Sequence, residues 1–144
     1  MTTNLIEKIQ SMWKQDSRID PDNLHNESLK VPELHSKYYE MLTNVILLKK
    51  SAEEERHITK HKKYEFYTGK ADPKEYEDVY QKKIRDKNHL DLCLNADEEI
   101  TKLNLKIEYY NTVLDYLSDI LKMIHGRTYQ IKNSIDAQKL IMGF

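Results

Sequence analysis

The sequence has few of the residues that make tight turns or crosslink small domains. It contains 3 Gly, 3 Pro and 1 Cys in 144 residues. So little Gly and Pro is poorly suited to the many tight turns of a β-sandwich or barrel. The single cysteine, Cys93, cannot form a disulfide within the chain, which fits a reducing compartment. These shortages favour a helix-rich chain and exclude a disulfide scaffold.

The chain also lacks an excess of charge of one sign, a long apolar run and a signal sequence. Lys and Arg total 23 against 24 Asp and Glu, so the overall charge gives no indication of nucleic acid. The longest uncharged apolar stretch, residues 41–48, is far shorter than the roughly 20 residues of a membrane-spanning helix. Residues 1–18 lack the apolar core of a signal peptide. We therefore expect a cytoplasmic protein with no membrane partner.

Helical periodicity organises most of the chain. Apolar residues recur at intervals of three and four in several long stretches, the spacing of one helix face. Asp72 before Pro73 is a typical helix start, and Gly69 is a typical helix stop. We interpret residues 1–144 as a single all-α domain, in which the predicted helices are 4–16, 32–68, 73–94 and 96–142.

The last predicted helix carries the strongest periodic signal. Its apolar residues alternate at spacings of four and three, the pattern of a helix that packs lengthwise against another. A helix of about 45 residues is about 68 Å long, and the rest of the chain is too short to cover its whole apolar set. We therefore expect long helices with heptad-type packing in a self-associating assembly. The residues expected at the contact between copies are Ile107, Tyr110, Leu114, Leu117, Leu121, Ile124, Ile131 and Ile135.

One stretch of the second predicted helix concentrates positive charge and aromatic rings. Residues 56–70, the basic–aromatic segment, have a local charge of +4 in a chain of net charge −1. Cations that follow the backbone and rings that stack on bases are typical of proteins that bind single-stranded nucleic acid. Arg56, Lys60 and Lys63 share one helix face, which Tyr67 extends by a turn. The candidate nucleic-acid contacts are Arg56, Lys60, His61, Lys62, Lys63, Tyr64, Phe66, Tyr67 and Lys70.

Other chemistries have little support in the sequence. A di-metal bundle needs Glu-x-x-His on two helices and further inward-pointing Glu residues, whereas the two helical carboxylate–His pairs of this chain include one with Asp in place of Glu. The Gly69-Lys70 pair lacks the Ser or Thr that follows it in a phosphate-binding loop. Cys93 has no flanking base. We therefore expect no catalytic residue, no metal and no cofactor; the two pairs are Glu54 with His57 and Asp86 with His89.

Residues 61–70, His-Lys-Lys-Tyr-Glu-Phe-Tyr-Thr-Gly-Lys, resemble the basic–aromatic motif of the UvsY family, the recombination mediators of tailed phages. The familiar form of that motif is Lys-Ala-Arg-Leu-Asp-Tyr-Tyr-Ser-Gly-Arg. Further blocks agree in order and spacing, so the resemblance covers nearly the whole chain. These blocks are Ile19-Asp20, Leu94–Asp97, Tyr109–Leu117 and the run from Ile131-Lys132 to Gly143.

The resemblance implies a non-enzymatic oligomer, a hexamer or heptamer in the cytoplasm of a phage host, that binds single-stranded DNA. Such proteins help a RecA-like recombinase to displace the single-strand-binding protein. Lys63 stands where the family has Arg, His61 where it has Lys, and Lys62 where it has Ala. A lysine lacks the bidentate fork of arginine, and a histidine is mostly neutral near pH 7. Lys60 and Lys62 therefore maintain the positive charge of the motif.

The residues alone leave two alternatives to a DNA-binding role. A structural coiled-coil assembly would use the basic–aromatic segment only as a solvated surface. An adaptor would use it to bind an acidic protein. Both alternatives keep the oligomer and lose single-stranded-DNA binding, so a salt-sensitive affinity for single-stranded DNA separates them from a recombination mediator.

Overall fold

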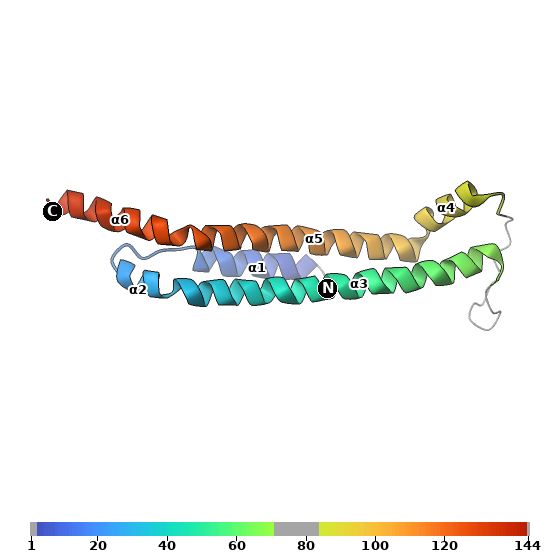
Figure 1. Ribbon diagram of the computed structural model, residues 1–144, viewed down its shortest axis with the longest axis horizontal. Helices are drawn as coiled ribbons and strands as arrows, with labels where there is room; N and C mark the ends of the chain where they lie inside the picture. Colours follow the sequence, from blue (N-terminus) through green and yellow to red (C-terminus); the bar gives the residue numbers. More distant parts are fainter. Residues whose placement is uncertain (1–2, 71–83, 144) are drawn as a thin grey trace. The chain divides into compact units, whose positions relative to one another are not determined.

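The computed structural model describes residues 3–70 and 84–143, and every regular element in these two ranges is an α-helix (Figure 1). The prediction of an all-α fold is confirmed. Within the same ranges, no helix is both long and apolar enough to cross a membrane. The helices are α1 (Thr3–Asp16), α2 (Leu24–Leu29), α3 (Val31–Thr68), α4 (Lys87–Ala96), α5 (Glu98–His125) and α6 (Arg127–Met142).

The first two predicted helices match the structure more closely than the last two. Helices α1 and α3 begin and end within one residue of the predicted ranges 4–16 and 32–68. The predicted helix 96–142 is instead two helices, α5 and α6, which meet at Gly126. Helix α5 begins only at Glu98, because Asp97 is extended and its carboxylate accepts hydrogen bonds from the first-turn amides.

The predicted helix 73–94 lies partly outside the described residues, which resume at residue 84. Residues 84–86 are not helical, and α4 starts at Lys87. Asp86 is the N-cap of α4, and its Oδ1 accepts a hydrogen bond from the His89 amide at 2.8 Å. The carboxylate–His spacing at this position is therefore explained by helix capping.

The chain divides into two compact units, which we describe separately. The terminal unit comprises Met1–Ile46 and Asn111–Phe144, and the central unit comprises Leu47–Tyr110. The terminal unit contains α1, α2, α6, the first part of α3 and the last part of α5. The central unit contains α4, the remainder of α3 and the first part of α5, which run in opposite directions (Figure 1).

A polar cluster around Asp16 lies within the terminal unit. Its carboxylate accepts a hydrogen bond from the buried Tyr38 hydroxyl at 2.8 Å and pairs with Lys37 at 2.6 Å. Trp13 packs edge-on against Tyr38, with the ring centroids 5.5 Å apart. Burial alone would raise the pKa of Asp16, but these two hydrogen bonds and the charges of Lys37 and Arg127 outweigh it and hold the pKa below its ordinary value. The cluster thus favours an ionised Asp16.

Arg127 fixes the start of α6 against the end of α1. Its side chain is buried, and Nη2 donates to the carbonyl oxygens of Asp16 at 2.9 Å and Arg18 at 3.1 Å. Carbonyl groups at a helix C-terminus lack partners within the helix, so a cation there is favourable. The contact gives a structural reason for a buried arginine in this unit.

Much of the heptad set is covered within one chain. Ile107, Tyr110, Leu117, Ile124 and Ile131 are buried, although the sequence analysis assigned them to a contact between copies. The other three residues of that set, Leu114, Leu121 and Ile135, are half-buried. Their neighbours at positions 113 and 120 are also buried. The helices of the same chain therefore bury most of the residues that were predicted to contact a second copy.

Candidate nucleic-acid interface

The basic–aromatic segment forms the end of α3 in the central unit, and α3 stops where Gly69 was predicted to stop it. Gly69 has φ +75°, a left-handed conformation that favours glycine. Its amide donates to the Phe66 carbonyl at 3.2 Å, and the Lys70 amide donates to the Glu65 carbonyl at 2.8 Å. This pair of bonds is a Schellman motif, which fixes the position of Lys70 relative to the helix.

The helix face shared by Arg56, Lys63 and Tyr67 points into the central unit. Arg56 Nη1 donates to Asn104 Oδ1 of α5 at 3.0 Å, and the Lys63 ammonium lies 3.3 Å from Asp97 Oδ2. The Tyr67 hydroxyl donates to the same Asp97 oxygen at 2.8 Å. Three of the four residues of the predicted common face thus make contacts inside the unit, and Lys60, the fourth, is exposed.

The drift of a straight helix explains this orientation. Val45 and Ala52 of α3 are both buried, and a strict heptad repeat would continue from them to Thr59. A helix with 3.6 residues per turn drifts by about 20° per heptad, so the inward direction passes instead to Arg56 and Lys63. The apolar stripe of α3 thus continues as a row of polar side chains that contact α5.

Asp97 is the centre of these inward contacts. Its side chain is about 5% exposed and pairs with Lys63, whose side chain is 16% exposed. Oδ1 also accepts hydrogen bonds from the amides of Glu99 at 3.0 Å and Ile100 at 3.2 Å. Burial alone would raise the pKa of Asp97, but the bonds from Tyr67 and Ile100 and the charge of Lys63 lower it overall. Asp97 therefore favours its ionised form and offsets the charge of Lys63.

A second carboxylate also offsets the charge of Lys63. Glu99 Oε1 lies 3.6 Å from the Lys63 ammonium. The same ammonium also lies 5.6 Å from the centre of the Phe66 ring, and that ring packs edge-on against Tyr67 at 5.2 Å. Lys63, Phe66 and Tyr67 thus make contacts inside the unit, and Phe66 and Tyr67 are only half-exposed.

The remaining predicted contacts, which include Lys60 of the predicted common face, lie at the solvent-exposed surface of α3. Lys60, His61, Lys62 and Lys70 are exposed, and His61 Nε2 lies 3.2 Å from Glu65 Oε1. Tyr64 is 41% exposed, and the Lys70 ammonium lies 5.9 Å from its ring centre. An exposed ring beside exposed cations is an arrangement that can stack a base while the cations meet its phosphates.

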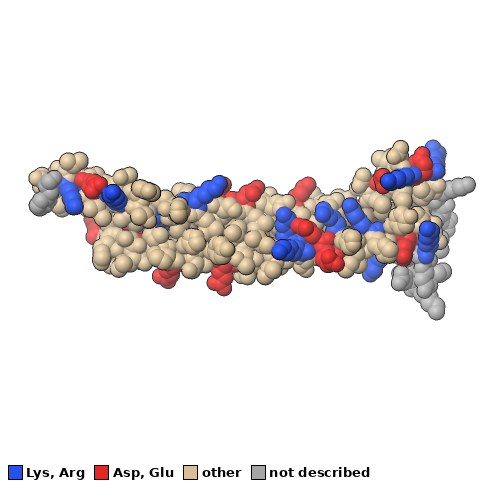
Figure 2. Space-filling view, in the orientation of Figure 1, with Lys and Arg blue, Asp and Glu red and all other residues tan. Residues whose placement is uncertain are grey.

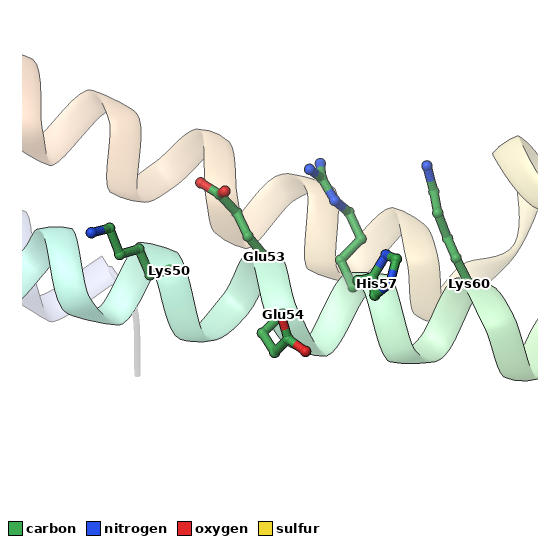
Figure 3. A pocket seen from close by; sticks show the side chains of 6 residues that line it. Lys50, Glu53, Glu54, His57 and Lys60 are labelled. Atoms are coloured by element: carbon green, nitrogen blue, oxygen red, sulfur yellow. The ribbon is translucent and has the colours of Figure 1, made fainter.

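A concavity on α3 adds residues that the sequence analysis missed. It has a volume of about 490 Å³ and is lined by Lys50, Glu53, Glu54, Arg56, His57 and Lys60 (Figure 3). Lys50, His57 and Tyr64 follow one another at seven-residue intervals, a signal that was present in the sequence. On the face shown in Figure 2, Lys and Arg side chains gather with a few acids over this second half of α3. The cationic surface therefore begins before residue 56.

The Glu54–His57 pair, one of the two helical carboxylate–His pairs, lines this concavity. In residues 3–70 and 84–143, no three His, Cys, Asp or Glu side chains gather closely enough to hold a metal ion. The lining has as many Lys and Arg residues as it has Glu and His together. Its chemistry suits an anion that several cations can share.

Comparisons with known proteins agree with the resemblance of the motif. The model of the UvsY family, described as "Recombination, repair and ssDNA binding protein UvsY", matches residues 12–144, a range that includes the whole central unit and all but the first eleven residues of the terminal unit. The "Recombination protein uvsY" of Enterobacteria phage T4 is 24% identical over 139 residues, which are 96% of this chain and 98% of the phage protein.

Solved structures extend the likeness to the fold. Two crystal structures of the bacteriophage T4 recombination mediator protein UvsY superpose with TM-scores of 0.83 and 0.84 at 23% and 21% identity. They cover 95% and 94% of this chain, and 97% and 98% of the chains matched. With a family match over nearly its whole length, the chain belongs to the UvsY family of recombination, repair and single-stranded-DNA-binding proteins.

Proposed function

We propose that this chain is a recombination mediator that binds single-stranded DNA and helps to load a RecA-like recombinase onto DNA coated by single-strand-binding protein. The observation that supports it best is the exposed surface of α3, where the Lys70 ammonium lies 5.9 Å from the exposed ring of Tyr64 and Lys60 lies one turn before that ring, in a member of this family. Such a surface binds the backbone through charge and the bases through stacking, whatever the sequence. The role needs no catalytic residue and no cofactor.

The proposed DNA contacts are the exposed members of the basic–aromatic segment. Lys60, Lys62 and Lys70 would meet phosphates, with His61 adding charge when it is protonated, and Tyr64 would stack on a base. The inward contacts of Lys63 support a structural role for that residue, so we exclude it from the proposed surface.

We also propose that several copies act together on one strand. A few cations per chain bind weakly, but linked copies raise the effective concentration of every further contact. A hexamer or heptamer, as the resemblance implies, would repeat the surface around the assembly. Leu114, Leu121 and Ile135 are the members of the predicted contact set with exposed area left for a second copy. If such an assembly bends the strand, it would loosen the single-strand-binding protein before the recombinase binds.

A loading assay tests this function. The single-stranded-DNA-dependent ATPase of a tailed-phage recombinase is measured on DNA saturated with its cognate single-strand-binding protein, with and without the chain. We expect the chain to shorten the lag before ATP hydrolysis, and the double variant Lys60→Gln/Lys62→Gln to restore the lag. Lys102→Gln is the matched control, because it also replaces an exposed lysine by glutamine, but on α5. An unchanged lag with the wild-type chain would contradict the mediator role.

A further inference from the structure

We propose that the concavity on α3 is a phosphate subsite for single-stranded DNA, and that Lys50, Arg56 and Lys60 supply its charge. The inference rests on the proposed function, because it assigns the same ligand to a neighbouring part of the same helix. It extends the proposed DNA surface from Lys60 back along α3 to Lys50.

Carboxylates offset the positive charge of Lys63 but not that of Arg56. Lys63 has two carboxylates within 3.6 Å. Arg56 instead donates to the neutral amide of Asn104, and among the described residues no carboxylate lies within 4.0 Å of its guanidinium. One hydrogen bond leaves most of the five guanidinium N–H donors for another acceptor. Arg56 is therefore a positioned cation whose charge is available to an anion.

The acidic side chains of the lining do not cancel this charge. Glu53 Oε1 lies 3.7 Å from the Lys49 ammonium, an i, i+4 ion pair that offsets its charge. Figure 3 shows Lys60 and Glu53 on the same side of α3, whereas Glu54 points away from both. Lys50, Arg56 and Lys60 then outnumber the one remaining acid of the lining. The concavity is cationic even while His57 is neutral.

The position of the concavity suits a strand that already contacts Tyr64. Lys50, His57 and Tyr64 lie about 10 Å apart along α3, since seven helical residues rise by about 10.5 Å. A strand that stacks a base on Tyr64 can therefore follow α3 back into the concavity. Its volume of about 490 Å³ lies in the range of about 300–1,000 Å³ typical of small-molecule sites. It can accommodate a phosphate together with its sugar.

The test measures how salt weakens the binding of a fluorescein-labelled oligo(dT) by fluorescence anisotropy. Wild type is compared with Lys50→Gln and Arg56→Gln, and with Lys102→Gln as the matched control. We expect each of the first two variants to lower the log–log salt slope by ~0.7, the contribution of one phosphate, and to weaken binding about fivefold at 0.1 M salt. Circular dichroism and light scattering confirm an unchanged fold and oligomer mass.

The outcomes separate this inference from the proposed function. If wild type fails to bind oligo(dT), the proposed function fails and the subsite with it. If Lys60→Gln/Lys62→Gln weakens binding but Lys50→Gln and Arg56→Gln keep the wild-type slope, only the subsite is wrong. Displacement of the oligonucleotide by polyglutamate at equal charge concentration would overturn the assignment to nucleic acid. Lys50 is exposed, so its variant tests the subsite even if Arg56→Gln disturbs α3.

Discussion

Replacing Asp97 tests whether this carboxylate holds the end of α3 against α5. Its two oxygens cap α5 through the amides of Glu99 and Ile100, accept the Tyr67 hydroxyl and pair with Lys63. Asp97→Ala removes all of these contacts at once. It also leaves the Lys63 ammonium, which is largely shielded from water, with Glu99 as its one remaining carboxylate partner among the described residues.

The magnitude follows from the separate contacts. An N-cap contributes about 0.5–2 kcal/mol, and a hydrogen bond to a charged acceptor about 1.5–3 kcal/mol. Removing one partner of a buried ion pair costs about 3–5 kcal/mol, but Lys63 keeps some exposure and a second carboxylate. Because these contributions overlap, we expect Asp97→Ala to lower the free energy of unfolding by about 3–5 kcal/mol. Asp97→Asn keeps the cap and should cost only about 1–2 kcal/mol.

Urea denaturation followed by circular dichroism measures these changes, at one protein concentration because association shifts apparent stability. A double-mutant cycle of Asp97→Asn with Lys63→Met isolates the ion pair. We expect a coupling free energy of about 1–2 kcal/mol, within the usual range for residues in contact. Strictly additive effects would refute the reasoning, since Asp97 would then contribute nothing to holding Lys63 in place.

Three further predictions concern pH and the DNA surface. Folding lowers the pKa values of Asp16 and Asp97, so the stability that these carboxylates provide above about pH 4 should be lost as the pH falls through their folded pKa values. Urea midpoints measured between pH 6 and 3 test this. The midpoint of Asp97→Asn should fall less over this pH range than that of the wild type. Asn104→Leu should weaken oligo(dT) binding about threefold with an unchanged salt slope, because it removes the hydrogen bond that orients a guanidinium but no charge; a changed slope would contradict a positioning role. Tyr64→Ala should cost about 1–3 kcal/mol of binding through lost stacking, whereas Tyr39→Ala, an exposed tyrosine in the terminal unit, should cost nothing in the same titration.

Local sequence signals predicted the elements that local physics determines. Apolar periodicity predicts α1 and the first half of α3, and Gly69 ends α3 because its left-handed conformation suits glycine. Each of these features depends on residues within a few turns of one another.

The orientation of Lys63 could not be predicted in the same way. It depends on a drift of about 20° per heptad, which a repeat written in sevens conceals. It also depends on Asp97, a residue 34 positions later in the sequence that only the tertiary fold brings within 3.3 Å. Lys63, which cations surround in the sequence, is therefore paired with a carboxylate in the folded chain.

The tertiary structure also decides which apolar heptad residues lie in the core and which are left for a second copy. A 4-3 spacing identifies the side of α5 that is covered, but it does not say which helix covers it. In this chain α5 packs Leu117 and Ile124 in the terminal unit and Ile107 in the central unit. A second copy would then meet half-buried residues such as Leu114 and Leu121, which the sequence pattern could not distinguish from the core.

The most direct test of the account is the salt dependence of oligo(dT) affinity for Lys60→Gln and Lys63→Met, compared with wild type at equal oligomer mass. Lys60 is exposed to solvent, whereas Lys63 is paired with Asp97 inside the central unit. We predict that Lys60→Gln lowers the log–log slope by ~0.7 and that Lys63→Met leaves the slope unchanged. A slope lowered by Lys63→Met and unaffected by Lys60→Gln would contradict the account.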